Sequence, residues 1–364
     1  NDGVFIIDGA SSNTIGGATT AHRNVIAGNS DGVQIGGASG GSNSNIVQNN
    51  YIGTDVTGTI DFGNNDDGVD IDNSALNNQV LNNLIAGNTG DGIDLGDAGA
   101  STGTIIQGNL IGTAANGRSA LGNAGAGIRI GNGGTANNTT IGGTTAGQGN
   151  TIAFNSQEGV FVVASTGVSI LGNSIYSNAF EGIELAADGV TPNDSGDADT
   201  GPNNLQNFPV LASANSNAAG TTIVGSLNSS ANTTLRIEFF ANRPSVADAT
   251  NGEGERYLGF INVTTNGSGV ATINTTLASV WVNSGDRITV TATNLTTNDT
   301  SEFAANVTAT STGIIVVDTT SDTVDGTTTS IINLGNNRGT DGRISLREAI
   351  VAANNTPTAA RRTE

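Results

Sequence analysis

Three aspartates and an asparagine in one short stretch have the residue types and spacing of a hard-cation site. Asp194, Asp197 and Asp199 fall within six residues, and Asn203 follows four residues later. Calcium binds about six to eight oxygens, drawn from carboxylates, backbone carbonyls and asparagine side chains. The stretch therefore predicts bound calcium as a cofactor, although its spacing is not that of an EF-hand. A solvated acidic linker explains the same composition equally well.

Other carboxylates have the chemistry for acid–base catalysis on sugars, since a carboxyl pair can cleave a glycosidic bond. Asp66 and Asp67 are adjacent, and Asp94 is the second acid in a similar stretch. Asp67 and Asp94 recur with the repeat described below, however, and a recurring residue is more simply structural. The chain has one histidine, His22, and no lysine. It also lacks the Gly-His-Gly and Arg-x-Lys motifs of galacturonidase-like hydrolases, so we expect no enzymatic activity.

Asn-x-Ser/Thr sequons offer a third kind of chemistry, attachment of glycans. They crowd one region of the chain, and five of them are Asn228, Asn232, Asn262, Asn274 and Asn294. In a secreted protein these asparagines are candidates for glycosylation. A sequence rich in threonine and asparagine also produces such sequons by chance.

The composition limits the partners that this chain can have. Its 364 residues carry a formal net charge of −20, with 32 acidic and 12 basic residues and no cysteine. A chain this acidic is repelled by nucleic acid and by anionic membranes, so no nucleic-acid partner is expected. No run of 18 apolar residues is present, so we expect no membrane insertion. The acidity suits calcium or a salty exterior, and solubility alone also explains it.

A short pattern recurs through the first 190 residues: glycine, an aliphatic residue, any residue and a second aliphatic residue. It begins at Gly3, Gly32, Gly68, Gly92, Gly127, Gly159 and Gly182. A longer period contains it, since "NYIGTDVTGTIDFGN" (50–64) returns 59 residues later as "NLIGTAANGRSALGN" (109–123). Coils of about 22–24 residues thus alternate with coils that carry an insertion of about ten residues.

These repeats predict short strands with one buried face. Val33 and Ile35 flank Gln34, for example, so the apolar side chains point one way and the polar one points to water. Asparagines recur at the expected corners: Asn29, Asn88, Asn155 and Asn178. They are expected to stack from coil to coil and to satisfy turn backbone groups. Coils of three short strands predict a parallel β-helix over residues 1–190.

The repeat stops at a stretch rich in proline, glycine and aspartate, which predicts an acidic junction loop over residues 191–207. From Phe208 onward the apolar runs lengthen and turn residues separate them. Seven such runs predict an immunoglobulin-like β-sandwich over residues 208–312, without the cysteine pair of antibody domains.

The stretch "RISLREAI" (343–350) predicts the start of a helix in a chain with almost no other helical pattern. Ser345 and Glu348 have the spacing of a capping box. Leu346, Ile350 and Ala353 follow one apolar helix face. Such a helix can cover the open end of a β-helix, where apolar core and unpaired strand edges invite association.

The segment before this helix predicts strands that add to such an open end. These are "IIVVD" (314–318) and "SIINL" (330–334). Residues 313–364 are therefore predicted to cap a following or neighbouring β-helix, not the one in residues 1–190. If the segment instead packs back on its own sandwich, or is disordered, with no neighbouring β-helix in contact, it is no shared cap.

Together these motifs resemble bacterial secreted or cell-surface proteins built on a right-handed parallel β-helix repeat. "NYIGTDVTGT", "NTIGG" and "DGVFI" are similar to the repeat signatures of that family, and "VDTTSDTVDG" and "SLREAI" resemble the N-terminal cap of its β-helices. "NDSGDADTGPNNLQNFPVL" and "GEGERYLG" resemble the junction and sandwich of multidomain members. The order departs from the family, because the cap comes last. The resemblance implies an extracellular, cell-surface location.

The expected function is a non-catalytic structural or adhesive module that assembles head to tail. Its main partner is itself, as separate subunits in a filament or as tandem modules in a stalk, and surface polysaccharide is a further candidate partner. The alternatives are a carbohydrate-active β-helix enzyme (polysaccharide lyase, hydrolase or epimerase) and a carbohydrate-binding module. Convergent basic side chains would favour the enzyme, and an exposed aromatic row would favour sugar binding.

Overall fold

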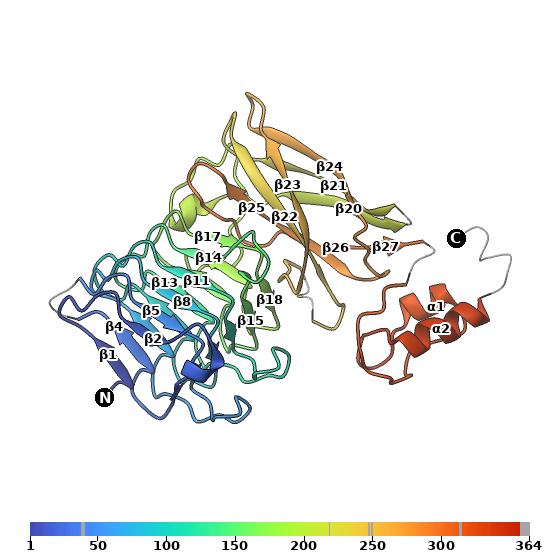
Figure 1. The fold of residues 1–364 in the computed structure, drawn as a ribbon. Helices are drawn as coiled ribbons and strands as arrows, with labels where there is room; N and C mark the ends of the chain where they lie inside the picture. Colours follow the sequence, from blue (N-terminus) through green and yellow to red (C-terminus); the bar gives the residue numbers. More distant parts are fainter. Residues whose placement is uncertain (38–40, 218, 247, 249, 313–314, 357–364) are drawn as a thin grey trace.

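A computed structural model describes residues 1–37, 41–217, 219–246, 248, 250–312 and 315–356. These residues form an all-β protein: three parallel sheets of short strands, then two antiparallel sheets, then a small C-terminal segment with two short helices (Figure 1). The predicted all-β class is confirmed. No helix in the described ranges is long and apolar enough to cross a membrane.

The chain visits the three parallel sheets in rotation, leaving one short strand in each before it returns to the first. Sheet A contains β1 (Val4–Ile6), β4 (Val33–Ile35), β7 (Val69–Ile71), β10 (Ile93–Leu95), β13 (Ile128–Ile130), β16 (Val160–Val162) and β19 (Ile183–Leu185). Sheet B contains β2 (Thr14–Gly16), β5 (Ile46–Gln48), β8 (Gln79–Leu81), β11 (Ile105–Gln107), β14 (Thr140–Gly142) and β17 (Ser169–Leu171). Sheet C contains β3 (Val25–Ile26), β6 (Tyr51–Ile52), β9 (Leu84–Ile85), β12 (Leu110–Ile111), β15 (Thr151–Ala153) and β18 (Ser174–Tyr176).

This rotation is compatible with the predicted parallel β-helix, and we call residues 4–185 the coil region. The seven glycine motifs supply the seven strands of sheet A, so the repeat phase was predicted correctly. The ten-residue insertions protrude between sheets C and A, where Thr54 pairs with Asp61 and Thr113 with Ala120. A short 3-10 helix, η1 (Thr20–His22), lies in the first coil.

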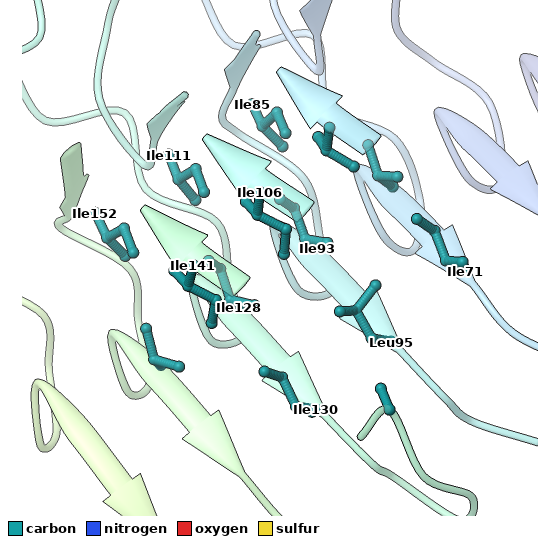
Figure 2. Close-up of a cluster of buried hydrophobic side chains, with 14 of the residues drawn as sticks. Ile71, Ile85, Ile93, Leu95, Ile106, Ile111, Ile128, Ile130, Ile141 and Ile152 are labelled. Atoms are coloured by element: carbon teal, nitrogen blue, oxygen red, sulfur yellow. The ribbon is translucent and has the colours of Figure 1, made fainter. Parts of the chain in front are cut away.

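The core of the coil region is a stack of aliphatic side chains, to which most strands of sheet A contribute two residues and the strands of sheets B and C one each (Figure 2). In the fourth coil Ile93 and Leu95 point inward from β10, and Ile111 meets them from β12. Their exposed fractions are all 0%. Because the register is fixed between coils, each aliphatic residue stacks on the equivalent residue of the next coil. Burial of apolar surface along this column stabilises the stack.

Two ladders of six asparagines each run along the corners of the coil region, and a shorter one joins Asn13, Asn45 and Asn78. In the first, the Asn29 backbone and side-chain N–H groups both donate to Oδ1 of Asn64, each at 3.2 Å. The same pattern continues through Asn88, Asn123, Asn155 and Asn178. The predicted stacking of corner asparagines is therefore confirmed. A second ladder, absent from the prediction, joins Asn24, Asn50, Asn83, Asn109, Asn150 and Asn173.

After the junction, which contains the 3-10 helix η2 (Pro202–Leu205), the chain forms two four-stranded sheets that are compatible with a sandwich. Sheet D contains β20 (Val210–Asn217), β21 (Gly220–Asn228), β24 (Val270–Ala278) and β27 (Thr310–Ser311). Sheet E contains β22 (Thr234–Asn242), β23 (Arg256–Thr264), β25 (Arg287–Asn294) and β26 (Val307–Thr308). Strand alternation alone predicts one buried face for β22, but both of its faces are buried, because sheet E also covers the end of the coil region.

That cover begins with two aromatic rings. Phe240 and Phe303 pack into the aliphatic core of the coil region, with their ring centroids 5.4 Å apart in an edge-to-face arrangement. Gly182 and Gly254 let the rings approach, because a Cβ at either glycine would lie within 2.9 Å of ring carbon. The last coil is therefore plugged by its own sandwich.

Acidic side chains complete the same cover by accepting backbone N–H groups of the last coil. Oε1 of Glu253 accepts from the backbone and side chain of Asn178, at 3.0 and 2.9 Å, and so ends the first asparagine ladder. Glu302 accepts from Leu185 at 3.0 Å, and Glu238 accepts from Gly172 at 2.8 Å. Strand edges left open would expose these donors. The sandwich thus replaces the next coil.

The C-terminal segment has two helices, α1 (Ile331–Asn336) and α2 (Leu346–Asn355). Two strand predictions fail in this segment. "SIINL" (330–334) is helical, because Ser330 caps α1 by accepting from the Asn333 backbone. Residues 315–318 of "IIVVD" have no strand partner, and residues 313–314 and 357–364 of the predicted cap lie outside the described residues.

Candidate functional site

An open, strongly acidic hollow of about 300 Å³ lies on the outer side of sheet A. Five aspartates and one arginine carry the charges of its lining, and we call these six residues the acidic groove: Asp66, Asp67, Asp91, Asp94, Asp97 and Arg129. Asp94 and Arg129 are the middle residues of β10 and β13, so their side chains point away from the core. Parallel register also places Asp70, on β7, beside Asp94.

The repeat explains part of this cluster. Asp31, Asp67 and Asp91 each precede the glycine that opens a strand of sheet A. Each carboxylate accepts a backbone N–H from the next coil, as Asp67 does from Asp91 at 2.6 Å. In the next coil Ala126 occupies the position before the glycine, so the row of carboxylates ends at Asp91. Asp91 accepts from the Ala126 backbone and also binds Arg129. Asp67 therefore has the structural role that its recurrence suggests.

Asp94 has no such role. Its exposed fraction is 2%, and within the described part of the chain its carboxylate has no hydrogen bond or ion pair. Arg129, the neighbouring cation, is engaged by Asp91 and by Gln157, whose Oε1 accepts at 2.8 Å. Asp70 resembles Asp94 in part, because one of its oxygens is buried without a partner and the other accepts from Gln34.

Burial and mutual repulsion keep these carboxyls from ionising. Burial, with the Asp91 charge next, raises the pKa of Asp67 to about 8. Burial and the Asp72 charge raise the pKa of Asp70 to about 8, and burial and the Asp97 charge raise that of Asp94 to about 10. At neutral pH and without a bound cation, these groups are therefore mostly protonated. A protonated carboxyl is an acid but not a general base.

Sequence reasoning found Asp66, Asp67 and Asp94 but missed the rest of the groove. The signal was present in "DGVDI" and "DGIDL", where acids before and after the glycine recur in consecutive coils. His22 lies in η1, is exposed, and its Nδ1 is 3.1 Å from the Thr19 hydroxyl.

The junction loop brings together the three aspartates of the predicted calcium site. One carboxylate oxygen from each of Asp194, Asp197 and Asp199 lies within 4.8 Å of the others. The Asp197 carboxylate accepts hydrogen bonds from Asn207, Gln206 and Ser229. Oδ1 of Asp199, by contrast, is buried without a partner among the described residues.

Asn203 has a different position from the one predicted. Its Oδ1 accepts from Val168, and its Nδ2 donates to Val168 and Thr300. The Asn203 side chain thus bonds the backbone directly before β17 and the Thr300 carbonyl, and it is not part of the aspartate cluster. Calcium at the three aspartates stays a prediction.

We expect the melting temperature to be higher in millimolar calcium than in excess chelator, because a ligand of the folded state stabilises it by mass action. The Asp199→Asn variant should show a smaller calcium-dependent shift, because it loses the carboxylate that has a free buried oxygen. Thermal unfolding followed by circular dichroism measures both. Equal shifts in the wild type and in the variant would rule out this loop as a calcium site.

The predicted cap helix forms with its predicted capping box. Ser345 Oγ accepts from the Glu348 backbone, and Oε2 of Glu348 accepts from the Ser345 backbone at 2.8 Å. Leu334, Ile344 and Ala352 form the small core beneath α2. The apolar face that was predicted for docking stays uncovered, since Leu346 is 63% exposed and Ile350 is 52% exposed, with Ala353 half-buried beside them.

The segment does contact its own sandwich, but through another side. Arg338 pairs with Asp286 at 2.6 Å, with both side chains 5% exposed, and it also donates to the Ser284 carbonyl. Asn283 bonds the backbone of Val316. The segment is therefore anchored by its loops, while the Leu346–Ile350 face of α2 points away from its own apolar core.

Large exposed apolar side chains also gather in the first two coils. They are Phe5, Val25, Val56, Ile60 and Phe62, with exposed fractions of 44–74%. Three of them, Val56, Ile60 and Phe62, belong to the insertion of the second coil. Of the asparagines at the first-coil corners, none has a donor for its Oδ1 among the described residues. The first coil is thus uncovered at both its apolar and its polar positions.

Four of the five sequon asparagines lie on strands of the antiparallel sheets, and Asn232 lies in the turn between β21 and β22. Asn232, Asn262 and Asn274 are exposed. Asn228 and Asn294 are half-buried, and both use Oδ1 to accept backbone N–H groups, Gly196 for the former and Thr296 for the latter. Exposure makes the first three the better glycan candidates.

Comparison with protein-family models and with curated proteins found no match for this chain.

Proposed function

We propose that this chain is a non-catalytic, extracellular structural module that joins to others head to tail. In this proposal a right-handed parallel β-helix is followed by an immunoglobulin-like sandwich and by a cap segment for another β-helix. The observation that carries it is that the chain has two uncovered surfaces, one on the apolar face of α2 and one on the first coil. The partner is a second copy, or a tandem module of the same polypeptide.

The two ends of the coil region support this reading. Its last coil is closed by the sandwich through Phe240, Phe303 and Glu253, so that end cannot receive the cap helix. The first coil keeps its core residues 7–8% exposed (Ile6, Ile15 and Ile26), whereas their equivalents in the second coil are 0% exposed, and the Asn24 amide oxygen has no donor among the described residues. Covering exposed apolar surface of this kind is favourable, and backbone pairing at strand edges adds hydrogen bonds.

The decisive experiment is the double substitution Leu346→Asp with Ile350→Asp. The wild-type protein should form oligomers that grow with concentration, since a head-to-tail contact without ring closure propagates. Two unpaired carboxylates would have to be buried in the contact, so the variant should stay monomeric. Analytical ultracentrifugation measures this, and electron microscopy shows whether the oligomers are filaments.

Asn354→Asp is the matched control, because it adds charge at an exposed position of α2 beside the apolar face. It should assemble like the wild type. A wild-type protein that is monomeric at every concentration, or a double variant that assembles normally, would contradict docking between separate chains through α2.

A carbohydrate-active enzyme is the second candidate, because the acidic groove gathers carboxyls on an open face of the coil region. Its weakness is the state of those groups: burial raises the pKa of Asp67 and Asp94 to about 8 and 10, so neither is an ionised base at neutral pH. Arg129 is already paired with Asp91. New reducing ends released from pectate, alginate or glucan, and lost in Asp67→Asn, would favour the enzyme.

A further inference from the structure

The acidic groove contains more carboxyl groups than its own cationic side chains can pair. Five aspartates line it together with one arginine, and that arginine is bonded to Asp91 and Gln157. Asp66 and Asp67 come within 4.8 Å of each other and of Asp31 at one edge of the groove. Buried carboxylates without a counter-charge are costly, so proteins pair them or place a metal beside them.

Asp94 is the residue that points to a ligand. Its side chain lines the hollow, is 98% buried by its 2% exposed fraction, and has no hydrogen-bonding partner among the described residues. A purely structural polar group at this position would be expected to bond to a backbone or side-chain donor. Asp67 differs, because one of its oxygens accepts from the Asp91 backbone and only the other remains for a ligand.

We infer that the acidic groove binds a hard divalent cation of the calcium class, with the carboxylate of Asp94 as a ligand and with further oxygens from the other aspartates that line the hollow. Oxygen-only ligands with several negative charges are the set that calcium prefers, and water fills the remaining positions. A softer metal would call for histidine or cysteine, and the chain has no cysteine and a single histidine. The inference is independent of head-to-tail assembly and of the junction loop.

The test uses calcium itself and the full chain, in an Asp199→Asn background that removes a free oxygen from the junction loop. Asp94→Asn keeps the shape of the side chain but removes its charge. Isothermal titration should detect calcium binding to the background protein and at least a tenfold weaker affinity after Asp94→Asn. Asp8→Asn, at an exposed aspartate outside the groove, is the matched control and should bind like the background protein.

Stability provides a second readout that a purely structural aspartate would not produce. In chelator, Asp94→Asn should melt at a higher temperature than the background protein, because it no longer buries an unpaired carboxyl. In millimolar calcium this advantage should shrink or reverse, because only the background protein gains from the bound ion. Calcium-independent differences between the two proteins, together with unchanged titration curves, would overturn the inference.

Discussion

Replacing Phe303 by alanine is expected to lower the free energy of unfolding by about 3–5 kcal/mol, the usual cost of emptying a buried phenylalanine site. Phe303 is 3% exposed, and its ring touches Phe240 while both lie in the core of the coil region. The substitution leaves a cavity where the sandwich meets the last coil. Denaturant unfolding of the wild type and of Phe303→Ala measures the loss, and hydrogen exchange at Leu185 and Ile175 reports whether the last coil opens.

Phe62→Ala is the control, because Phe62 is 61% exposed in the insertion of the second coil. Its effect should be within about 0.5 kcal/mol of zero, as for most surface substitutions. The double variant Phe240→Ala with Phe303→Ala should cost less than the sum of the two single variants, since each single variant already breaks their contact. Similar losses for Phe303→Ala and Phe62→Ala would contradict the plug.

Raising the pH from about 5 to about 9 is expected to lower the free energy of unfolding by a few kcal/mol. Burial raises the pKa of Glu253 and of Glu302 to about 8 in the folded protein, and for Glu253 this outweighs the hydrogen bonds from Asn178 and Ser177. An ordinary glutamate titrates near 4.3. The stability that these groups contribute is therefore complete below the ordinary value and is lost as the pH rises through about 8.

Urea unfolding at several pH values measures this slope. The pKa values of Asp67, Asp70 and Asp94 are also raised, so these groups add to the same pH dependence. A variant is therefore needed to isolate the contribution of Glu253. Glu253→Gln cannot titrate, so its stability should depend less steeply on pH, although it is less stable at pH 5 because one acceptor oxygen is lost. Asp8→Asn, at an exposed residue, should follow the wild type. Parallel profiles for Glu253→Gln and the wild type would show that Glu253 does not titrate in this range.

The repeat was predictable because its signals are local. The glycine motif marks the seven strands of sheet A, and the corner asparagines mark a ladder that forms as predicted. The capping box of α2 lies within four residues of sequence and also formed. Each of these features depends on neighbours in the chain or on an identical position one coil away.

The missed contacts of the sandwich have one physical cause, which is contact between segments far apart in the sequence. Nothing in the local sequence marks Glu253 and Glu302 as partners of the last coil. Glu253 is 75 residues from its partner Asn178, and Glu302 is 117 residues from its partner Leu185. Residues 330–334 were predicted as a strand because a short apolar run suits both strand and helix. The Ser330 cap and packing of Leu334 on Ile344 favour the helix.

The asparagine ladders have a direction, and it restricts how two molecules can meet. Every corner amide donates to the oxygen of the following coil, from Asn24 to Asn173 in one ladder and from Asn29 to Asn178 in the other. The last coil therefore presents donors, which Glu253 accepts, while in the first coil the amide oxygens of Asn24 and Asn29 have no donor among the described residues. Two first coils placed face to face would set these unpaired oxygens against one another. A twofold-symmetric pair is thus disfavoured at this end, and any fibre built through it has two chemically different tips.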